Sequence, residues 1–198
     1  EALRLALDRR TMTNGIFGSS AGVPDAAQSQ IWAWVTGGRM EGAVRDLAKA
    51  RTLLETNLHG VIGTVAAILP ALLAQGHGTI GIVSSVAGYG GLPKALVYGA
   101  SKAALINFAE TLYLDLAPRG LGVALINPGF VRTPLTDRNA FPMPYLISAD
   151  EAAAEIVAGL ERGDFEIHFP RAFSRRLKLL RLLPYRWYFA IVRKATGI

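Results

Sequence analysis

The sequence predicts an α/β fold in which helices cover both faces of a parallel β-sheet. Short apolar segments alternate along the chain with longer helical patterns, and 21 of the 198 residues are glycine. This composition favours an α/β domain over a helix bundle. The strand candidates are apolar throughout, which is typical of parallel strands buried on both faces. With 51% hydrophobic residues, the chain can form one domain with a substantial core.

The alternation of elements is clear from about residue 43 onward. Apolar residues at helical spacing mark the helices, whereas short apolar runs that end in small polar residues or in Pro-Gly mark the strands. The predicted helices span residues 43–74, 95–117 and 148–163, and the predicted strands span residues 78–85, 121–129 and 164–170.

Two helix ends carry specific signals. Ser148 is the expected N-cap of the third helix, with Glu151 in capping-box register, and Gly163 is its expected C-cap. The second helix is expected to close at residues 118–120, which read Pro-Arg-Gly.

Residues 1–42 are less regular. Residues 1–10 form a short amphipathic helical pattern, and residues 14–23 resemble a strand that runs into a small-residue turn. The segment IWAWVTGGRMEG (31–42) combines two tryptophans with a glycine cluster and matches no single element.

Residue usage excludes several kinds of site. The chain has no cysteine, which excludes disulfides, thiolate metal ligands and a cysteine nucleophile. Its three histidines, His59, His77 and His168, are scattered, so no metal site is assigned. No uninterrupted apolar run approaches the roughly 20 residues that span a bilayer, and no secretory leader is recognised. We therefore expect a cytoplasmic protein.

Small and polar residues follow three of the predicted strands. In a parallel α/β sheet, ligands bind at the carboxyl ends of the strands, where loops and helix N-termini converge. Tyr98 and Lys102 begin the helix after the second of these ends, and their spacing places them on one helix face. Asn57 lies within the first long helix, where asparagine is locally unfavourable. The three strand ends are Ser19-Ser20-Ala21-Gly22, Ser84-Ser85 and Asn127-Pro128-Gly129.

Together, these residues resemble the short-chain dehydrogenase/reductase family. Ser85 precedes Tyr98 by 13 residues, the Tyr-x-x-x-Lys pair follows, and Asn57 stands in an N-x-x-G motif one helix earlier. NPGFVRTP (127–134) supplies a PG-x-x-x-T loop after the next strand. The resemblance covers roughly residues 14–170. It implies a Rossmann-like, doubly wound parallel sheet in three layers, followed here by a C-terminal helical extension.

The resemblance also implies an NAD(P)-dependent oxidoreductase that interconverts a carbonyl and an alcohol. Tyr98 would be the acid/base, and Lys102 would favour its phenolate and hold the nicotinamide ribose. Ser85 would stabilise the substrate oxygen, and Asn57 would hold a water that links Lys102 to solvent. NADP is slightly favoured over NAD, although no residue in the sequence reveals the preference. Further cofactor contacts are implied at Ala21, Gly22, Pro128, Gly129, Val131 and Thr133.

Several of these residues also have structural interpretations. Ser84 and Ser85 could cap a strand-to-helix turn, Asn57 could be a buried hydrogen-bonding residue, and Thr133 could be the N-cap of a following turn. The small residues at positions 99–101 are interpreted as leaving room for a cofactor. Four residues could either line a substrate pocket or simply pack: Tyr89, Leu92, Phe130 and Met143.

Two features depart from the family pattern. The Ser-Ser-Ala-Gly stretch at residues 19–22 replaces the usual Asn-Asn-Ala-Gly, and serine reaches less far. The glycine-rich TGxxxGxG turn is absent, because VTGGRMEG (35–42) imitates it out of register and too close to Asn57. Two βα units of roughly 30 residues each would be missing. We expect the glycine-rich part to be missing from this chain, because without it a dinucleotide should bind poorly.

Two functions therefore remain open. The first is the oxidoreductase, and the second is a catalytically silent binding or scaffold protein that kept the fold. Family members usually pair through the two long helices, here residues 43–74 and 95–117. A homodimer or homotetramer is the corresponding expectation.

Positive charge is concentrated at the C-terminal end. Residues 171–198 carry eight basic residues and no acid, whereas residues 1–170 carry 13 basic and 15 acidic residues. A general nucleic-acid-binding function therefore loses its support. We divide the chain into an oxidoreductase domain (1–170) and a basic amphipathic extension (171–198). The extension predicts either contact with an anionic membrane or a helix pair that caps the substrate cleft or packs on a partner subunit.

Overall fold

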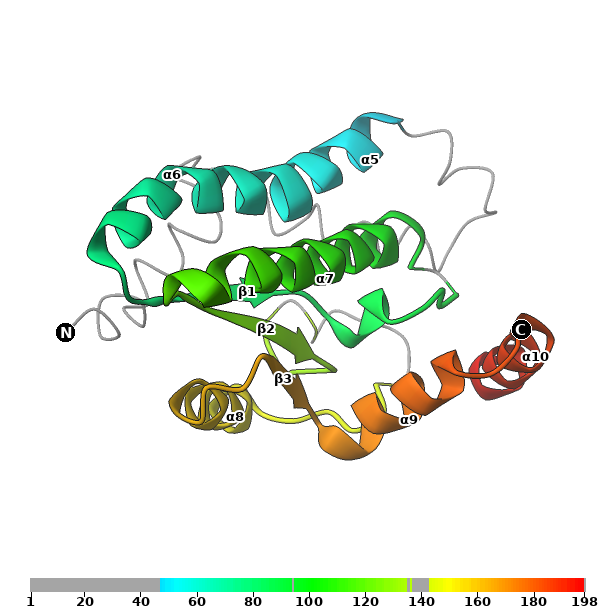
Figure 1. Ribbon diagram of the computed structural model, residues 1–198. Coiled ribbons are helices and arrows are strands. Elements are labelled where there is room, and N and C mark those ends of the chain that lie inside the picture. Colours follow the sequence, from blue (N-terminus) through cyan, green and yellow to red (C-terminus); the bar gives the residue numbers. More distant parts are fainter. Residues whose placement is uncertain (1–46, 94, 135, 137–142, 198) are drawn as a thin grey trace.

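The computed structural model describes residues 47–93, 95–134, 136 and 143–197 (Figure 1). The predictions for residues 1–46 lie outside the described residues. They include the amphipathic pattern of residues 1–10, the strand end at residues 14–23 and the glycine cluster of VTGGRMEG.

The described residues contain a parallel sheet of three strands in the order β1-β2-β3. These are β1 (Thr79–Val83), β2 (Gly122–Pro128) and β3 (Glu166–Phe169). Each lies within a predicted strand. The central strand β2 has five consecutive buried residues, so it needs apolar side chains on both faces.

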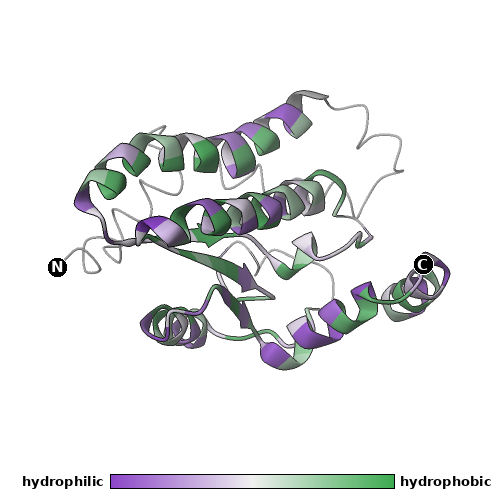
Figure 2. Ribbon diagram, in the orientation of Figure 1, coloured by the Kyte–Doolittle hydropathy of each residue, from purple (hydrophilic) through white to green (hydrophobic). Residues whose placement is uncertain are grey.

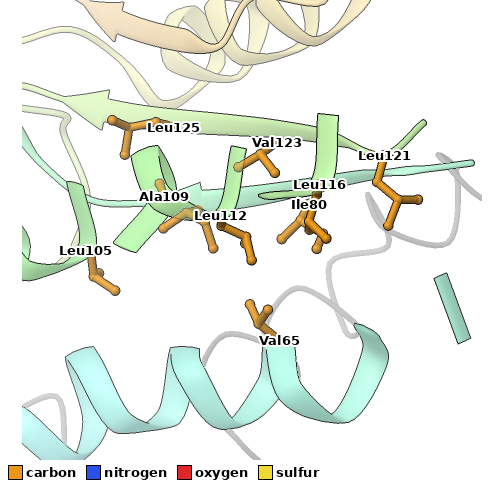
Figure 3. Close-up of a cluster of buried hydrophobic side chains, with 10 residues drawn as sticks. Val65, Ile80, Leu105, Ala109, Leu112, Leu116, Leu121, Val123 and Leu125 are labelled. Atoms are coloured by element: carbon orange, nitrogen blue, oxygen red, sulfur yellow. The ribbon is translucent and has the colours of Figure 1, made fainter. Parts of the chain in front are cut away.

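Helices cover both faces of this sheet, as predicted. On one face, α7 (Leu96–Leu116) packs its Leu105 and Leu112 against Val123 and Leu125 of β2 (Figure 3). On the other face, α8 (Ala149–Glu161) packs its Ala152 into a second cluster that contains Ala124, Ile126, Ile167 and Phe169. Alternate residues of β2 point to opposite faces and therefore join different clusters.

A long helix lies outside α7 (Figure 1). It consists of α5 (Leu47–Leu54), a π-helical turn η1 (Glu55–His59) and α6 (Gly60–Gln75), and it confirms the predicted helix from residue 47 onward. Val65 of α6 points toward Leu112 of α7 and joins the core cluster (Figure 3). The π-turn was not predicted, and it contains Asn57.

By length and composition alone, this outer helix would suffice to cross a membrane. The stretch Lys49–Gln75 has 27 residues, and a window of 18 residues within it has a mean hydropathy of 1.7. The sequence contains no uninterrupted apolar run of that length. The mean hydropathy is nevertheless high, because the polar residues inside the helix are outweighed by its apolar residues. Within the described residues, only 6% of that window is buried, and Val65 is the buried residue of α6.

The predicted helix caps are largely confirmed. The Ser148 Oγ accepts a hydrogen bond from the Glu151 amide (3.1 Å), and the Glu151 carboxylate accepts one from the Ser148 amide (2.8 Å). This capping box begins α8. The C-cap is Arg162, one residue earlier than predicted, and Gly163 follows with φ 73°. Helix α7 closes through a 3₁₀ turn that ends at Gly120, as predicted.

The C-terminal extension forms a pair of helices, α9 (Arg171–Arg181) and α10 (Tyr185–Thr196). Pro184 breaks the helical run and becomes the N-cap residue of α10. Helix α9 follows β3 directly, and α10 lies farther out at the same end of the molecule (Figure 1). The division of the chain after Pro170 stays a prediction.

Candidate active site

Ser85 lies at the carboxyl end of β1, in extended conformation. Its Oγ accepts a hydrogen bond from the Ala87 amide (3.1 Å), which begins a 3₁₀ turn, η2 (Val86–Gly88). The same hydroxyl donates to the Pro128 carbonyl (3.4 Å) at the end of β2. The Ser85 side chain therefore connects the ends of two neighbouring strands.

Tyr98 and Lys102 approach Ser85 from the first turns of α7. The Tyr98 and Ser85 side chains share a hydrogen bond. Lys102 is only 9% exposed, and its Nζ donates to the Val83 carbonyl (3.1 Å) and lies 5.7 Å from the centre of the Tyr98 ring. The structure thus brings together three of the four predicted catalytic side chains.

Burial dominates the electrostatics of this group. It raises the pKa of Tyr98, and the hydrogen bond with Ser85 offsets only part of that rise. Burial also lowers the pKa of Lys102 to about 8. Both shifts follow from the cost of placing a charged form in an apolar environment. The direction for Tyr98 is opposite to the predicted lowering by Lys102, because loss of solvent outweighs the favourable neighbours.

The two adjacent serines have different partners. Ser84 is almost fully buried, and its Oγ donates to the backbone carbonyl of Lys102 (2.8 Å). Ser84 therefore holds α7 against the end of β1, whereas Ser85 faces the Tyr98 hydroxyl.

Asn57, the fourth predicted catalytic residue, lies in the π-turn η1, which packs against α7. Its Nδ2 atom is buried and has no hydrogen-bond partner among the described residues. A buried amide donor without a partner is costly, and π-turns are frequent at functional sites. The amide donor suits the predicted role of holding a water, and that role stays a prediction.

Gly88 allows the turn after Ser85 to pack against α7, and it was not among the predicted site residues. A β-carbon on Gly88 would lie 2.8 Å from the backbone carbon of Lys102 and 2.9 Å from the Ala103 amide nitrogen. Turn η2 therefore rests directly on the backbone of α7. The only local signal was the position of Gly88 three residues after Ser85. The contact that requires glycine is with Lys102, 14 residues away, so no local pattern reveals it.

The small residues before Lys102 also serve this packing. A β-carbon on Gly99 would lie 3.3 Å from the Ala87 carbonyl of η2. Ser101 is fully buried, and its Oγ donates to the Tyr98 carbonyl (2.8 Å). Only Ala100 of residues 99–101 is exposed. These contacts give two of the three small residues a role in packing within the protein, and the interpretation that they make room for a cofactor stays a prediction.

Substitution of Gly88 by Ala is expected to destabilise the protein by about 1–3 kcal/mol, because the methyl group meets backbone atoms that cannot move aside separately. Urea denaturation measures this change. Gly63→Ala is the matched control, since a β-carbon at Gly63 has no neighbour within 4 Å. Alanine in that helix should stabilise by roughly 0.5–1 kcal/mol. Equal stability changes in the two variants would contradict the close approach of η2 to α7.

The loop after β2 carries the remaining predicted cofactor contacts that the structure describes. Pro128 accepts the Ser85 hydrogen bond, and the Gly129 amide donates to the Phe169 carbonyl (2.7 Å). A β-carbon on Gly129 would lie 3.1 Å from the Pro170 ring, a tight contact that favours glycine at this position. Val131 forms an isolated bridge with Ile147.

Thr133 is the last residue of that set. Thr133 and Thr136 exchange backbone-to-side-chain hydrogen bonds of 2.8 and 3.2 Å, which supports the interpretation of Thr133 as a turn cap. Contacts of this loop with a cofactor stay predictions. Ala21 and Gly22 lie outside the described residues.

A polar cluster around Glu166 lies beside the site and was not predicted. The Glu166 carboxylate accepts hydrogen bonds from the Tyr89 hydroxyl (2.7 Å) and the Asn127 amide (2.9 Å), and it pairs with Lys178 of α9. Burial raises the pKa of Glu166, but the hydrogen bonds from Lys178, Tyr89 and Asn127 outweigh it and leave the pKa below its usual value. These partners are far apart in sequence, so no local pattern reveals them.

This cluster changes the interpretation of two residues that could have lined a pocket. Tyr89 is held by Glu166, and its pKa is raised by burial and by the neighbouring carboxylate. Phe130 stacks on Phe173 of α9, with ring centres 5.9 Å apart. Phe130 therefore packs on the extension, and Tyr89 meets it through Lys178, whose Nζ lies 5.4 Å from the Tyr89 ring centre. In the described parts of the chain, no group of three or more His, Asp or Glu side chains is arranged to hold a metal ion.

Comparison with known proteins supports the family resemblance. The model of the short chain dehydrogenase family matches residues 35–141, a narrower span than the motifs suggested. That span contains Asn57, Ser85, Tyr98 and Lys102. The chain is 37% identical over 146 residues to an uncharacterised oxidoreductase of Myxococcus xanthus. The alignment covers 74% of this chain and 58% of that protein, so the chain spans little more than half of this relative's length.

Solved structures agree on the fold. A short-chain dehydrogenase from Burkholderia cenocepacia, in complex with NADP, matches with a TM-score of 0.66 and 27% identity, over 75% of this chain and 60% of that chain. A short-chain dehydrogenase from Sphingobium yanoikuyae, in complex with NADPH, matches with a TM-score of 0.60 and 22% identity, over 72% and 60%. Because its identity is only 22%, the second match supports the fold alone. Together these findings confirm the Rossmann-like α/β fold, and the chain belongs to the short-chain dehydrogenase/reductase family.

Proposed function

We propose that this protein is an NAD(P)-dependent oxidoreductase that interconverts a carbonyl and an alcohol. The observation that carries the proposal is the meeting of Ser85, Tyr98 and Lys102 at the carboxyl ends of β1 and β2. A phenol, a hydroxyl and a buried ammonium at one point can donate a proton, polarise an oxygen and supply positive charge. The complex of the Burkholderia cenocepacia relative with NADP supports NADP as the first candidate cofactor.

The residues present fit a nicotinamide cofactor. Tyr98 and Lys102 offer a hydroxyl and an ammonium as donors for ribose hydroxyls, and the buried Asn57 Nδ2 offers a further donor nearby in the fold. The bound cofactor would supply the hydride. Pro128, Gly129, Val131 and Thr133 would contact its nicotinamide end, as the family resemblance implies.

The protein's own residues would carry the proton. Tyr98 is held as a neutral phenol because burial raises its pKa, so its hydroxyl proton is available for a substrate oxygen. Ser85 would donate a second hydrogen bond to that oxygen and stabilise its developing negative charge. Lys102 retains its proton below about pH 8 and would stabilise the phenolate left behind. The protonated phenol is the form that donates a proton when a carbonyl is reduced.

The decisive experiment measures consumption of NADPH and NADH with a panel of aldehydes and ketones. The full-length protein is used, because this chain spans 58% of its Myxococcus xanthus relative. Turnover with at least one carbonyl, together with dinucleotide binding by calorimetry, is the expected result. If the full-length protein bound no dinucleotide, the alternative of a catalytically silent binding or scaffold protein would replace the oxidoreductase.

We also propose that two copies pair through the outer helix and α7. Both helices expose large apolar side chains in the described structure, among them Ile62, Ile68 and Leu114. Pairing would bury these residues, and it agrees with the homodimer or homotetramer expected from the family resemblance.

A further inference from the structure

The C-terminal helices expose an unusual combination of large apolar and basic side chains. Leu182 is 80% exposed, Leu179 is 65% exposed and Trp187 is 53% exposed. Hydrophobic and hydrophilic residues are interleaved along both α9 and α10 (Figure 2). We refer to the following exposed residues as the C-terminal surface: Arg175, Leu179, Leu182, Leu183, Arg186, Trp187, Ile191, Arg193 and Lys194.

On α9, this surface lies away from the side that packs on the protein. Ser174 is fully buried, and it donates hydrogen bonds within the first turn of the helix. Arg175 and Leu179 are four residues apart on α9 and share a different face. Both are exposed, so α9 presents a cation and a leucine outward, and Leu182 and Leu183 are exposed directly after its end.

On α10, the apolar exposure occurs although the helix is firmly attached. Tyr188 and Val192 are buried, and the Tyr188 hydroxyl donates to the Gly91 carbonyl (2.8 Å). Trp187 and Ile191, also four residues apart, remain largely exposed. The exposure of these two side chains therefore does not reflect incomplete packing of α10, because another face of the helix is already buried.

The positive charge of the C-terminal surface indicates what kind of partner it would bind. Residues 171–198 contain eight basic residues and no acidic residue. The Arg186 guanidinium lies 4.8 Å from the Trp187 ring centre, which couples a cation to an aromatic side chain of the type enriched at membrane interfaces. A second copy of this surface would place like charges together. A nucleic acid would use the cations but would leave the leucines without a role.

From these observations, we propose that the C-terminal surface docks on an anionic phospholipid membrane. The leucines, Trp187 and Ile191 would enter the headgroup boundary, and the arginines and lysines would contact lipid phosphates. The Gly91 carbonyl that holds α10 lies in the segment between Ser85 and Tyr98, and Glu166 holds α9. Docking would therefore place the membrane beside the segment that leads into the candidate active site.

Vesicle flotation with the full chain tests this proposal. Binding is expected to vesicles that contain phosphatidylglycerol and to be much weaker with pure phosphatidylcholine. The double variant Arg193→Gln/Lys194→Gln should weaken binding by about fivefold for each cation removed. The double variant Leu182→Ser/Trp187→Ser should weaken binding by about tenfold or more for each side chain. Circular dichroism checks that each variant is folded.

The matched control changes equivalent residues elsewhere on the molecule. Arg119 and Arg162 are exposed and lie outside the extension, so Arg119→Gln/Arg162→Gln removes two cations, as Arg193→Gln/Lys194→Gln does. This control should bind anionic vesicles as the unmodified protein does.

Three results would overturn the proposal. The first is the absence of binding to phosphatidylglycerol vesicles, and the second is an equal loss in the control variant. The third is vesicle binding that is insensitive to Leu182→Ser/Trp187→Ser, with DNA duplex binding that depends on Arg193 and Lys194. That result would show a general polyanion surface. If the apolar substitutions dissociated an oligomer and vesicles did not bind, the surface would instead be an interface between copies.

Discussion

Replacement of Tyr98 by Phe is expected to lower the turnover number by about 10²- to 10⁴-fold, the range for loss of a general acid. Phenylalanine retains the ring that lies 5.7 Å from the Lys102 Nζ but lacks the hydroxyl that bonds Ser85. Proton donation to the substrate oxygen is therefore lost while the packing of α7 remains. Initial rates of reduced-nicotinamide consumption measure the effect, and calorimetry checks that the dinucleotide still binds.

The matched control is Tyr113→Phe on the same helix. Tyr113 is 40% exposed and packs its ring against Phe165, with ring centres 4.9 Å apart, far from the carboxyl end of β1. This variant should keep the full turnover number. Retained activity in Tyr98→Phe would mean that another group supplies the proton, and the role proposed for Tyr98 would be wrong.

Replacement of Lys102 by Met is expected to abolish most turnover and, at the same time, to raise the free energy of unfolding by up to about 3 kcal/mol near neutral pH. This change in stability follows from the pKa of the lysine side chain, which is 10.5 for an ordinary lysine and about 8 for Lys102 in the fold. Burial penalises the ammonium in the folded protein, whereas the unfolded chain holds it in water. Methionine keeps the length of the side chain without that penalty.

The pH dependence gives this prediction a clear sign. Between about pH 8 and pH 10.5, the unfolded chain binds the Lys102 proton and the folded chain does not. The stability of the unmodified protein should therefore rise with pH through this window, and the advantage of Lys102→Met should disappear toward its upper end. Urea denaturation at both ends of the window measures the difference.

Lys49→Met serves as the control, because Lys49 lies on the exposed side of the outer helix. Its effect on stability should stay within about 0.5 kcal/mol, as is usual for a substitution on the surface. If Lys102→Met were instead less stable than the unmodified protein near neutral pH, the ammonium would be stabilising the fold. The buried ammonium of Lys102 would then not lower the free energy of unfolding.

Local patterns were sufficient to predict most elements of the described fold. The capping box at Ser148 needs only residues three apart, and the apolar run of β2 reflects burial on both faces. Tyr98 and Lys102 share a helix face because of helical spacing alone. The π-turn at Asn57 has no comparable local signal, since its hydrogen bonds differ from those of an α-helix by a single residue.

The sequence by itself determined the family, the parallel α/β order and the set of Ser85, Tyr98 and Lys102, because these depend on short spacings. Only the tertiary structure decided which of two neighbouring serines faces Tyr98, since successive side chains at a strand end point in opposite directions. It also decided that Gly88 must be small and that Glu166 binds Tyr89 and Lys178. The direction of the Tyr98 pKa shift belongs to this second group, because burial is a property of the packed molecule rather than of the residues next to Tyr98 in sequence.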